Sequence, residues 1–238
     1  MTDSAKGIMA MPMFLADAIR FIAEVIVYGL AMSAAGAALV ALWGLGTWYW
    51  RIAAFPAAYV ALIFGFYTAL LLVRVVFVRK VRPGSYSLSE RGALRWIVAD
   101  SMMRMIERSF LRGYLKEFAI PRYLFYRVMG AKIDASFMLG VDVRILDPWL
   151  LKVGPKSLIG SFVVISGHAV EGNTVTLAPV RIGANVTIGM RAILMPGASI
   201  GDGAMIGAGA LVSKGTQVPA GETWAGVPAR KMDRKEKP

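Results

Sequence analysis

A single histidine, His168, is the residue of this 238-residue chain best suited to move a proton. A neutral imidazole accepts a proton near pH 7, so a histidine beside a substrate can act as a general base. Two carboxylates could orient its ring: Glu171 lies close in sequence, and Asp147 comes earlier. The sequence does not decide between them. A lone histidine is also often structural, so its setting in the chain must decide its role.

Other catalytic chemistries lack the residues they need. The chain has no cysteine, which removes disulfides, thiolate metal sites and a cysteine nucleophile. One histidine does not make the three-histidine zinc site of the β-helical carbonic anhydrases. GxSxG, Walker and GxGxxG patterns do not occur. We therefore expect no metal, and direct transfer between two bound substrates rather than a covalent intermediate on the protein.

The C-terminal half repeats an aliphatic residue every six positions. A six-residue period fits neither an α-helix nor a simple hairpin, but it fits a short strand followed by a tight corner. Three such sides close a triangular coil of about 18 residues, the hexapeptide β-helix, with the aliphatic side chains pointing inward. Known prisms of this kind are left-handed, an exception to the right-handed crossover rule. The seven positions are Ile182, Ile188, Leu194, Ile200, Ile206, Val212 and Val218.

The same phase extends toward the N-terminus and is broken twice. Two more coils are predicted from Ile133, Leu139 and Ile145, and from Val153, Ile159 and Ile165. A small slip lies near residues 148–152. A longer slip, residues 167–181, must leave the prism as a loop, and it contains His168. Because loops on rigid scaffolds often carry sites, we predict an active-site loop there.

The N-terminal third is predicted to enter a membrane. Mean hydropathy is +0.58 and 57% of the residues are hydrophobic, which is high for one soluble domain. After a loose tail (residues 1–13) and an interfacial lead-in (14–24), residues 25–50 and 52–73 carry no charge. Each run is long enough to span a bilayer as a helix. A buried helical hairpin of a soluble protein is the alternative.

Lysine and arginine follow the second span. Arg74, Arg79, Lys80 and Arg82 lie after it, whereas the turn between the spans has only Arg51. This bias predicts a multi-pass protein of the inner (cytoplasmic) membrane, with both termini and the β-helix on the cytoplasmic side.

A basic stripe is predicted next to the membrane. Residues 93–116 have helical periodicity, and Arg104, Arg108, Arg112 and Lys116 recur every four residues. With a formal net charge of +12, this face indicates contact with anionic lipid or a phosphorylated substrate, unless it is merely solvated. Nucleic acid is not expected as a partner, because no binding motif accompanies the charge.

These patterns predict an α+β fold: a transmembrane helical hairpin and juxtamembrane helices, followed by a left-handed parallel β-helix. The expected parts are residues 1–82, with the tail and the two spans, and residues 83–130, with the amphipathic helices. Residues 131–238 form the β-helix with its loop at about 167–181.

Residues 162–231 carry a resemblance to a known family. The segments SGHAVEG, PVRIGANVTIGMRAILMPGASIGDG, GAGALVSK and AGVPARK resemble the hexapeptide-repeat acyltransferases, especially the sugar O-acetyltransferases. The resemblance implies homotrimers that bind acyl-CoA in grooves between adjacent prisms. It also implies that His168 deprotonates the acceptor hydroxyl or amine, which then attacks the thioester directly.

The resemblance also implies further site residues. Asp147, in RILDP, falls near an acceptor-binding acidic position of the family. Thr187 stands where the sugar transferases often carry tryptophan, so the pantetheine groove differs, and acyl-ACP stays open as the donor. The implied donor-binding positions are Met190 and Ala208 through their backbone, and Ser213, Lys214 and Arg230.

The N-terminal half resembles a different group. VRPGSYSLSERGALRW and PRYLFYRVMGAKID resemble the membrane-embedded terminal domains of nonribosomal peptide synthetases, including poly-lysine synthetase. Those domains are linked to the joining of amino-acid units.

The function expected from the sequence is a membrane-anchored O- or N-acyltransferase with a membrane-associated or lipid-linked acceptor. Its partners would be membrane lipids and further copies of the chain. Two alternatives remain: a domain that forms amide bonds from aminoacyl thioesters, and a non-catalytic trimeric membrane scaffold.

Overall fold

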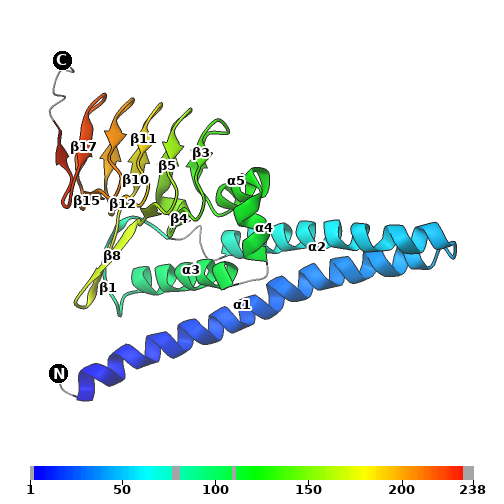
Figure 1. The fold of residues 1–238 in the computed structure, drawn as a ribbon. Coiled ribbons are helices and arrows are strands. Elements are labelled where there is room, and N and C mark those ends of the chain that lie inside the picture. The colour runs from blue at the N-terminus through cyan, green and yellow to red at the C-terminus, as the bar shows by residue number, and fades with distance from the viewer. Residues whose placement is uncertain (1–2, 77–80, 109–110, 233–238) are drawn as a thin grey trace.

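A computed structural model describes residues 3–76, 81–108 and 111–232. Two long helices, α1 (Asp3–Trp43) and α2 (Trp48–Val76), form an antiparallel hairpin (Figure 1). The prediction of a loose tail over residues 1–13 is therefore wrong from Asp3 onward, because α1 begins at Asp3 and includes these residues. Arg79 and Lys80, on which part of the topology prediction rests, lie outside the described residues.

Small residues allow the two helices of the hairpin to approach closely. A Cβ added to Gly65 of α2 would lie 3.0 Å from the Cα of Ala31 and 3.1 Å from the Cβ of Ala34 in α1. Val27 and Leu70 are buried in the same contact region. The two backbones can lie this close because Gly65, Ala31 and Ala34 are all small.

Three shorter helices connect the hairpin to the β-helix: α3 (Arg91–Arg108), α4 (Leu111–Glu117) and α5 (Ala119–Val128). The single helix predicted over residues 93–116 is therefore divided. Arg104 and Arg112 are both exposed, but they lie on different helices. The side chains of Arg108 and Lys116 lie outside the described residues, so the basic stripe is not established as one face.

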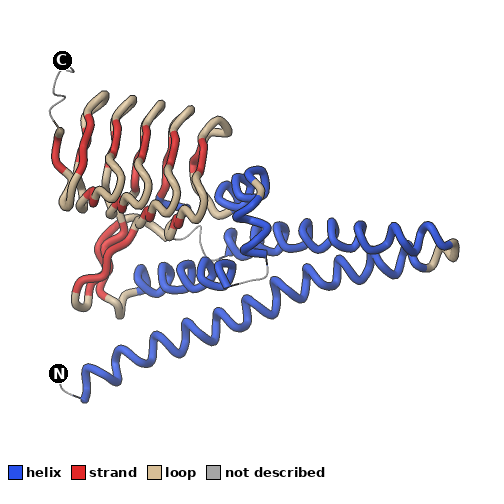
Figure 2. The backbone as a smooth tube through the Cα atoms, in the orientation of Figure 1, coloured by secondary structure: helices blue, strands red, loops and turns tan. Residues whose placement is uncertain are grey.

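The C-terminal part is a parallel β-helix of short strands (Figure 2). Its three faces, A, B and C, are crossed in that order in each coil. Face A contains β2 (Lys132–Ile133), β5 (Leu151–Val153), β10 (Val180–Ile182), β13 (Ser199–Ile200) and β16 (Gln217–Val218). Face B contains β3 (Met138–Leu139), β6 (Leu158–Ile159), β11 (Thr187–Ile188), β14 (Met205–Ile206), β17 (Thr223–Ala225) and the antiparallel β18 (Arg230–Lys231). Face C contains β4 (Arg144–Ile145), β7 (Val164–Ile165), β12 (Ile193–Leu194) and β15 (Leu211–Val212).

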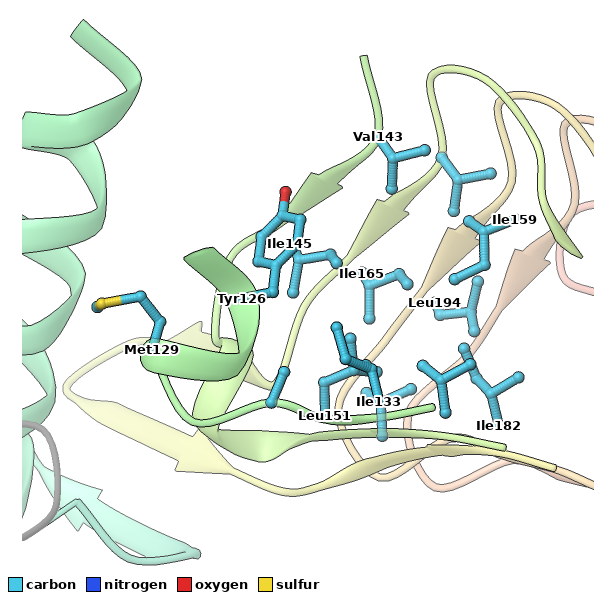
Figure 3. Packing of buried hydrophobic residues seen from close by; sticks show 14 of the residues in the cluster. Tyr126, Met129, Ile133, Val143, Ile145, Leu151, Ile159, Ile165, Ile182 and Leu194 are labelled. Carbon is cyan, nitrogen blue, oxygen red and sulfur yellow. The ribbon is translucent and has the colours of Figure 1, made fainter. Parts of the chain in front are cut away.

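The predicted aliphatic repeat forms the core of the prism. Ile133, Val153, Ile182, Ile200 and Val218 are paired in register from coil to coil on face A. The repeat positions are buried, except for Leu139, which is partly buried. Figure 3 shows part of this set, including Ile133, Ile159 and Ile182, along the inside of the prism, with Tyr126 of α5 beside Ile145 of the first coil. The predicted six-residue period is confirmed.

Both predicted slips appear as irregular elements. A short 3-10 helix, Pro148–Leu150, occupies the first. The second is a β-hairpin of β8 (His168–Glu171) and β9 (Thr174–Leu177), rather than an irregular loop. Strand β1 (Gly84–Ser87), which precedes α3, pairs antiparallel with β9 and makes a three-stranded sheet (Figure 1). The predicted fold class is confirmed, and the hairpin carrying His168 is tied to the N-terminal part.

Candidate active site

His168 and Asp147 form a hydrogen-bonded pair. The Nδ1 atom of His168 lies 2.6 Å from Oδ2 of Asp147, and the side chains are 19% and 0% exposed. His168 opens the hairpin directly after the end of face C. Asp147 lies one coil earlier, just before the 3-10 helix. The two predicted irregularities in the repeat therefore bring together one base and one carboxylate.

Two further donors fix the Asp147 carboxylate. The Trp96 Nε1–H donates to Oδ1 at 3.1 Å, and the Gly167 backbone N–H donates to Oδ2 at 2.9 Å. A Cβ at Gly167 would lie 2.9 Å from the Cβ of Leu150 and 3.0 Å from the Cβ of Asp147. Glycine is thus required at position 167 for the backbone to reach the carboxylate. Of the two carboxylates that the sequence left open, Asp147 is the one that contacts the ring of His168.

Helix α3 contributes residues to the site that sequence reasoning missed. The Trp96 ring lies against the imidazole of His168, with centroids 4.7 Å apart and planes tilted by 53°. One turn further on, Asp100 is 6% exposed and accepts a 2.7 Å hydrogen bond from Nε of Arg104. The spacing of Trp96, Asp100 and Arg104 places them on one helix face, but nothing in the sequence indicates that this face meets the hairpin.

The surroundings change the acidity of two groups. Burial lowers the pKa of His168, but the hydrogen bond and charge of Asp147, helped by the charge of Asp100, outweigh burial and raise it above its ordinary value. Burial raises the pKa of Asp100, despite its hydrogen bond to Arg104. The ring of His168 is therefore a stronger base than a free imidazole.

The geometry defines what the pair can do. With a hydrogen on Nδ1 donated to the carboxylate of Asp147, the lone pair of a neutral ring lies on Nε2. No group among the described residues hydrogen-bonds that nitrogen. A ring held in this tautomer by a buried carboxylate can take a proton from a substrate hydroxyl or amine.

Glu171, the other candidate carboxylate, lies elsewhere. Its side chain is 68% exposed, and its Oε1 lies 2.5 Å from Nζ of Lys214, which follows face C two coils further along. The pair joins the tip of β8 to the β-helix. Within the described ranges, no three His, Asp or Glu side chains gather where a metal ion could bind.

The implied donor-binding residues divide between two edges of the prism. Ser213 and Lys214 lie where face C turns into face A, the same edge from which the His168 hairpin leaves. Met190 and Ala208 are stacked at the edge between faces B and C, and Arg230 belongs to β18 of face B. Met190, Ala208 and Arg230 are exposed. One chain therefore does not bring all five residues to one edge.

Comparison with known proteins supports the repeat. Residues 179–214 match the family described as bacterial transferase hexapeptide (six repeats). The matched segment covers strands β10 to β15 and the corners between them. Together with the observed coils, this match supports the hexapeptide repeat that the sequence predicted.

A curated relative matches a longer stretch of the chain. The chain is 24% identical over 174 residues to the delta-poly-L-ornithine synthetase of Acinetobacter baumannii (strain AB307-0294). The match includes 73% of this chain but only 13% of that synthetase. The chain thus spans a small part of the length of this relative.

Solved structures similar to this chain are hexapeptide-repeat enzymes. A maltose O-acetyltransferase from Clostridium difficile 630 is 19% identical, with a TM-score of 0.47 over 65% of this chain and 94% of that one. A hexapeptide-repeat acetyltransferase from Vibrio cholerae, solved with acetyl coenzyme A, is 13% identical, with a TM-score of 0.46 over 70% and 99%. An N-acyltransferase from Bacillus cereus is 19% identical, with a TM-score of 0.40 over 44% and 63%.

Proposed function

We propose that the protein is a membrane-anchored acyltransferase that moves an acyl group from acyl-CoA to a hydroxyl or amine. The observation that carries the proposal is the oriented pair of His168 and Asp147 on a hexapeptide-repeat domain. Acetyl coenzyme A is the ligand named for the similar Vibrio cholerae protein. Acyl-ACP would use the same chemistry.

The reaction needs one base and two positioned substrates. Nε2 of His168 takes the proton from the acceptor as its oxygen or nitrogen attacks the thioester carbonyl. A new C–O or C–N bond forms, the C–S bond breaks, and the leaving thiolate takes the proton back from the imidazolium. Proton removal by a positioned base supplies about 10²–10⁴-fold in rate, and holding both substrates together supplies much of the rest. Asp147 stabilises the imidazolium while it exists.

The hairpin of α1 and α2 supports a membrane-side acceptor. Residues 24–43 and 48–72 are long and apolar enough to cross a bilayer, with mean hydropathies of 2.1 and 1.9. Only 11% and 22% of these windows are buried within the chain, unlike the core helices of a soluble protein. Holding the prism at a bilayer would raise the effective concentration of a lipid-linked acceptor. The proposed topology places both termini and the β-helix on the cytoplasmic side of the inner membrane.

In a homotrimer, the donor-binding residues from the two edges of the prism would come together in one groove. The edge with His168 and Lys214 from one prism would face the edge with Met190 and Ala208 from its neighbour. Acyl-CoA would then lie in the groove between them, as the family resemblance implies. Exposed apolar side chains on faces B and C, including Met205 and Ile193, support such a contact.

The decisive test is substitution of His168, the proposed base. In the purified full-length chain, His168→Ala should lower thioester consumption in the presence of acceptor by about 10²-fold or more, with binding of CoA retained. The control is Gln217→Ala, at an exposed position of β16. Unchanged turnover in His168→Ala would exclude His168 as the base. If neither protein binds CoA or acyl-ACP, the non-catalytic scaffold gains support.

The similarity to a poly-ornithine synthetase favours a second candidate, amide formation from aminoacyl thioesters. The same base would then deprotonate an amine, and the donor would be an aminoacyl group on a carrier thiol. Parallel assays with acetyl-CoA and with an aminoacyl thioester would separate the two. A product whose new bond is an amide between amino acids would favour the second candidate.

A further inference from the structure

Trp96 of α3 contacts both members of the pair that carries the base. Its Nε1–H donates to Oδ1 of Asp147, while its ring lies against the imidazole of His168. Oδ2 of Asp147 is already engaged by His168 and by the N–H of Gly167. The two carboxylate oxygens are thus held by different elements, and only α3 holds Oδ1.

We propose that Trp96 is a positioning residue for acyl transfer, so that a helix of the N-terminal part belongs to the active centre. It fixes the rotation of the Asp147 carboxylate and covers one face of the His168 ring, which together set the direction of Nε2. The inference rests on the proposed function, in which His168 is the base. A base must meet its proton at hydrogen-bond distance, so a rotated ring loses rate even when both substrates bind.

Asp100 and Arg104 lie on the same face of α3 as Trp96 and place further charge near the site. Asp100 follows Trp96 by one turn, is buried, and is bonded to the more exposed Arg104. The charged groups that act on His168 are Asp147, Asp100 and Arg104, the first two favouring an imidazolium and the last opposing it. Helix α3 therefore both orients the base and changes the charge around it, which an anchor alone would not require.

The test uses the one histidine of the chain as a reporter. Full-length protein in detergent is labelled with ¹⁵N in the imidazole ring, and the tautomer of the neutral ring is read from the nitrogen shifts. The wild type should show the Nδ1–H tautomer. Trp96→Phe leaves the carboxylate in place but frees it to rotate, so the Nδ1 resonance should shift toward that of a weaker hydrogen bond. kcat should fall about tenfold, with the KM of acetyl-CoA unchanged, because a hydrogen bond to a charged group is lost.

Trp149 provides a matched control. It packs against the same apolar cluster as Trp96, but its buried Nε1 has no hydrogen-bond partner among the described residues. Trp149→Phe should therefore leave the Nδ1 resonance of His168 as in the wild type. If Trp96→Phe does not fold, the benzothiophene analogue of tryptophan at position 96 removes only the N–H.

The two possible failures are distinguishable. An Nδ1 resonance in the Trp96 variants equal to that of the wild type and of Trp149→Phe would overturn the inference and show that Trp96 only packs against the site. Absence of transfer by the wild type, with every thioester tried, would overturn the proposed function, while the ring-nitrogen shifts would still report whether Trp96 fixes the ring.

Discussion

At the scale of single residues, the active centre depends on Asp147, which has no exposed side-chain surface and accepts hydrogen bonds from three elements. A buried carboxylate of this kind is costly unless each lone pair is used. Here its partners are the base itself, a helix indole and a backbone N–H. The residue that the sequence suggested for acceptor binding is therefore placed to act on the base.

Asp147→Asn should move the pH dependence of the reaction. The pKa of His168 is raised mainly by Asp147, so the acid limb of kcat/KM in the wild type should lie above the ordinary histidine value of about 6.5. The variant should shift that limb to lower pH and reduce kcat about 10²-fold, because the neutral amide no longer holds the Nδ1–H tautomer. A pH–rate profile of both proteins measures this. An acid limb that stays in place would mean that another group titrates.

The raised pKa of His168 also affects the stability of the fold. Because the folded pKa of His168 is above its unfolded value, the charged ring stabilises the fold fully below about pH 6.5. That contribution is lost as pH rises through the folded pKa. Thermal unfolding followed across this range should therefore depend less on pH in His168→Gln than in the wild type. Equal pH dependence in the two proteins would contradict the assignment.

Gly167→Ala should disturb the site through the backbone. The added Cβ would lie too close to Leu150 and Asp147, so the N–H of residue 167 must move away from the carboxylate. We expect a loss of about 1–3 kcal/mol in stability and a fall in kcat. Gly113→Ala, in α4, is the control, because no atom lies within 4 Å of its added Cβ. Similar melting temperatures for the two variants would show that the hairpin adapts without strain.

At the scale of elements, the pair of Glu171 and Lys214 connects the hairpin to the prism. An exposed ion pair contributes at most about 1 kcal/mol, so neither Glu171→Gln nor Lys214→Gln should change thermal stability much. If Lys214 also binds donor phosphates, Lys214→Gln should raise the KM for acyl-CoA several-fold. Glu171→Gln frees the ammonium and should leave this KM the same or lower. Equal effects of the two substitutions on KM would assign the pair a purely structural role.

The sequence specified the β-helix better than the site. Seven aliphatic residues in phase determine the coils, because each must point into the same narrow prism. The breaks in phase located His168 and Asp147, but the hydrogen bond between them needed coordinates. Trp96 could not be predicted, since contact between α3 and the hairpin depends on β1 pairing with β9, far away in sequence.

At the scale of the whole molecule, the proposed topology can be measured directly, because the chain has no cysteine of its own. In intact cells, Thr47→Cys in the turn between α1 and α2 should react with a membrane-impermeant maleimide. Gln217→Cys on the β-helix should react only after lysis. Both positions are exposed in the chain, so a difference in labelling would not come from burial within the protein. Labelling of Gln217→Cys from outside would reverse the proposed orientation.

The three-stranded sheet has a consequence for the molecule as a unit. Leu177 of β9 pairs with Gly84 of β1 on one side and with His168 on the other, so a single strand separates β1 from the residue proposed as the base. The prism is consequently not an interchangeable module. Grafting the prism alone onto another anchor, or cutting the chain between α3 and β2, would remove β1 and α3 and leave His168 without the contacts of Trp96.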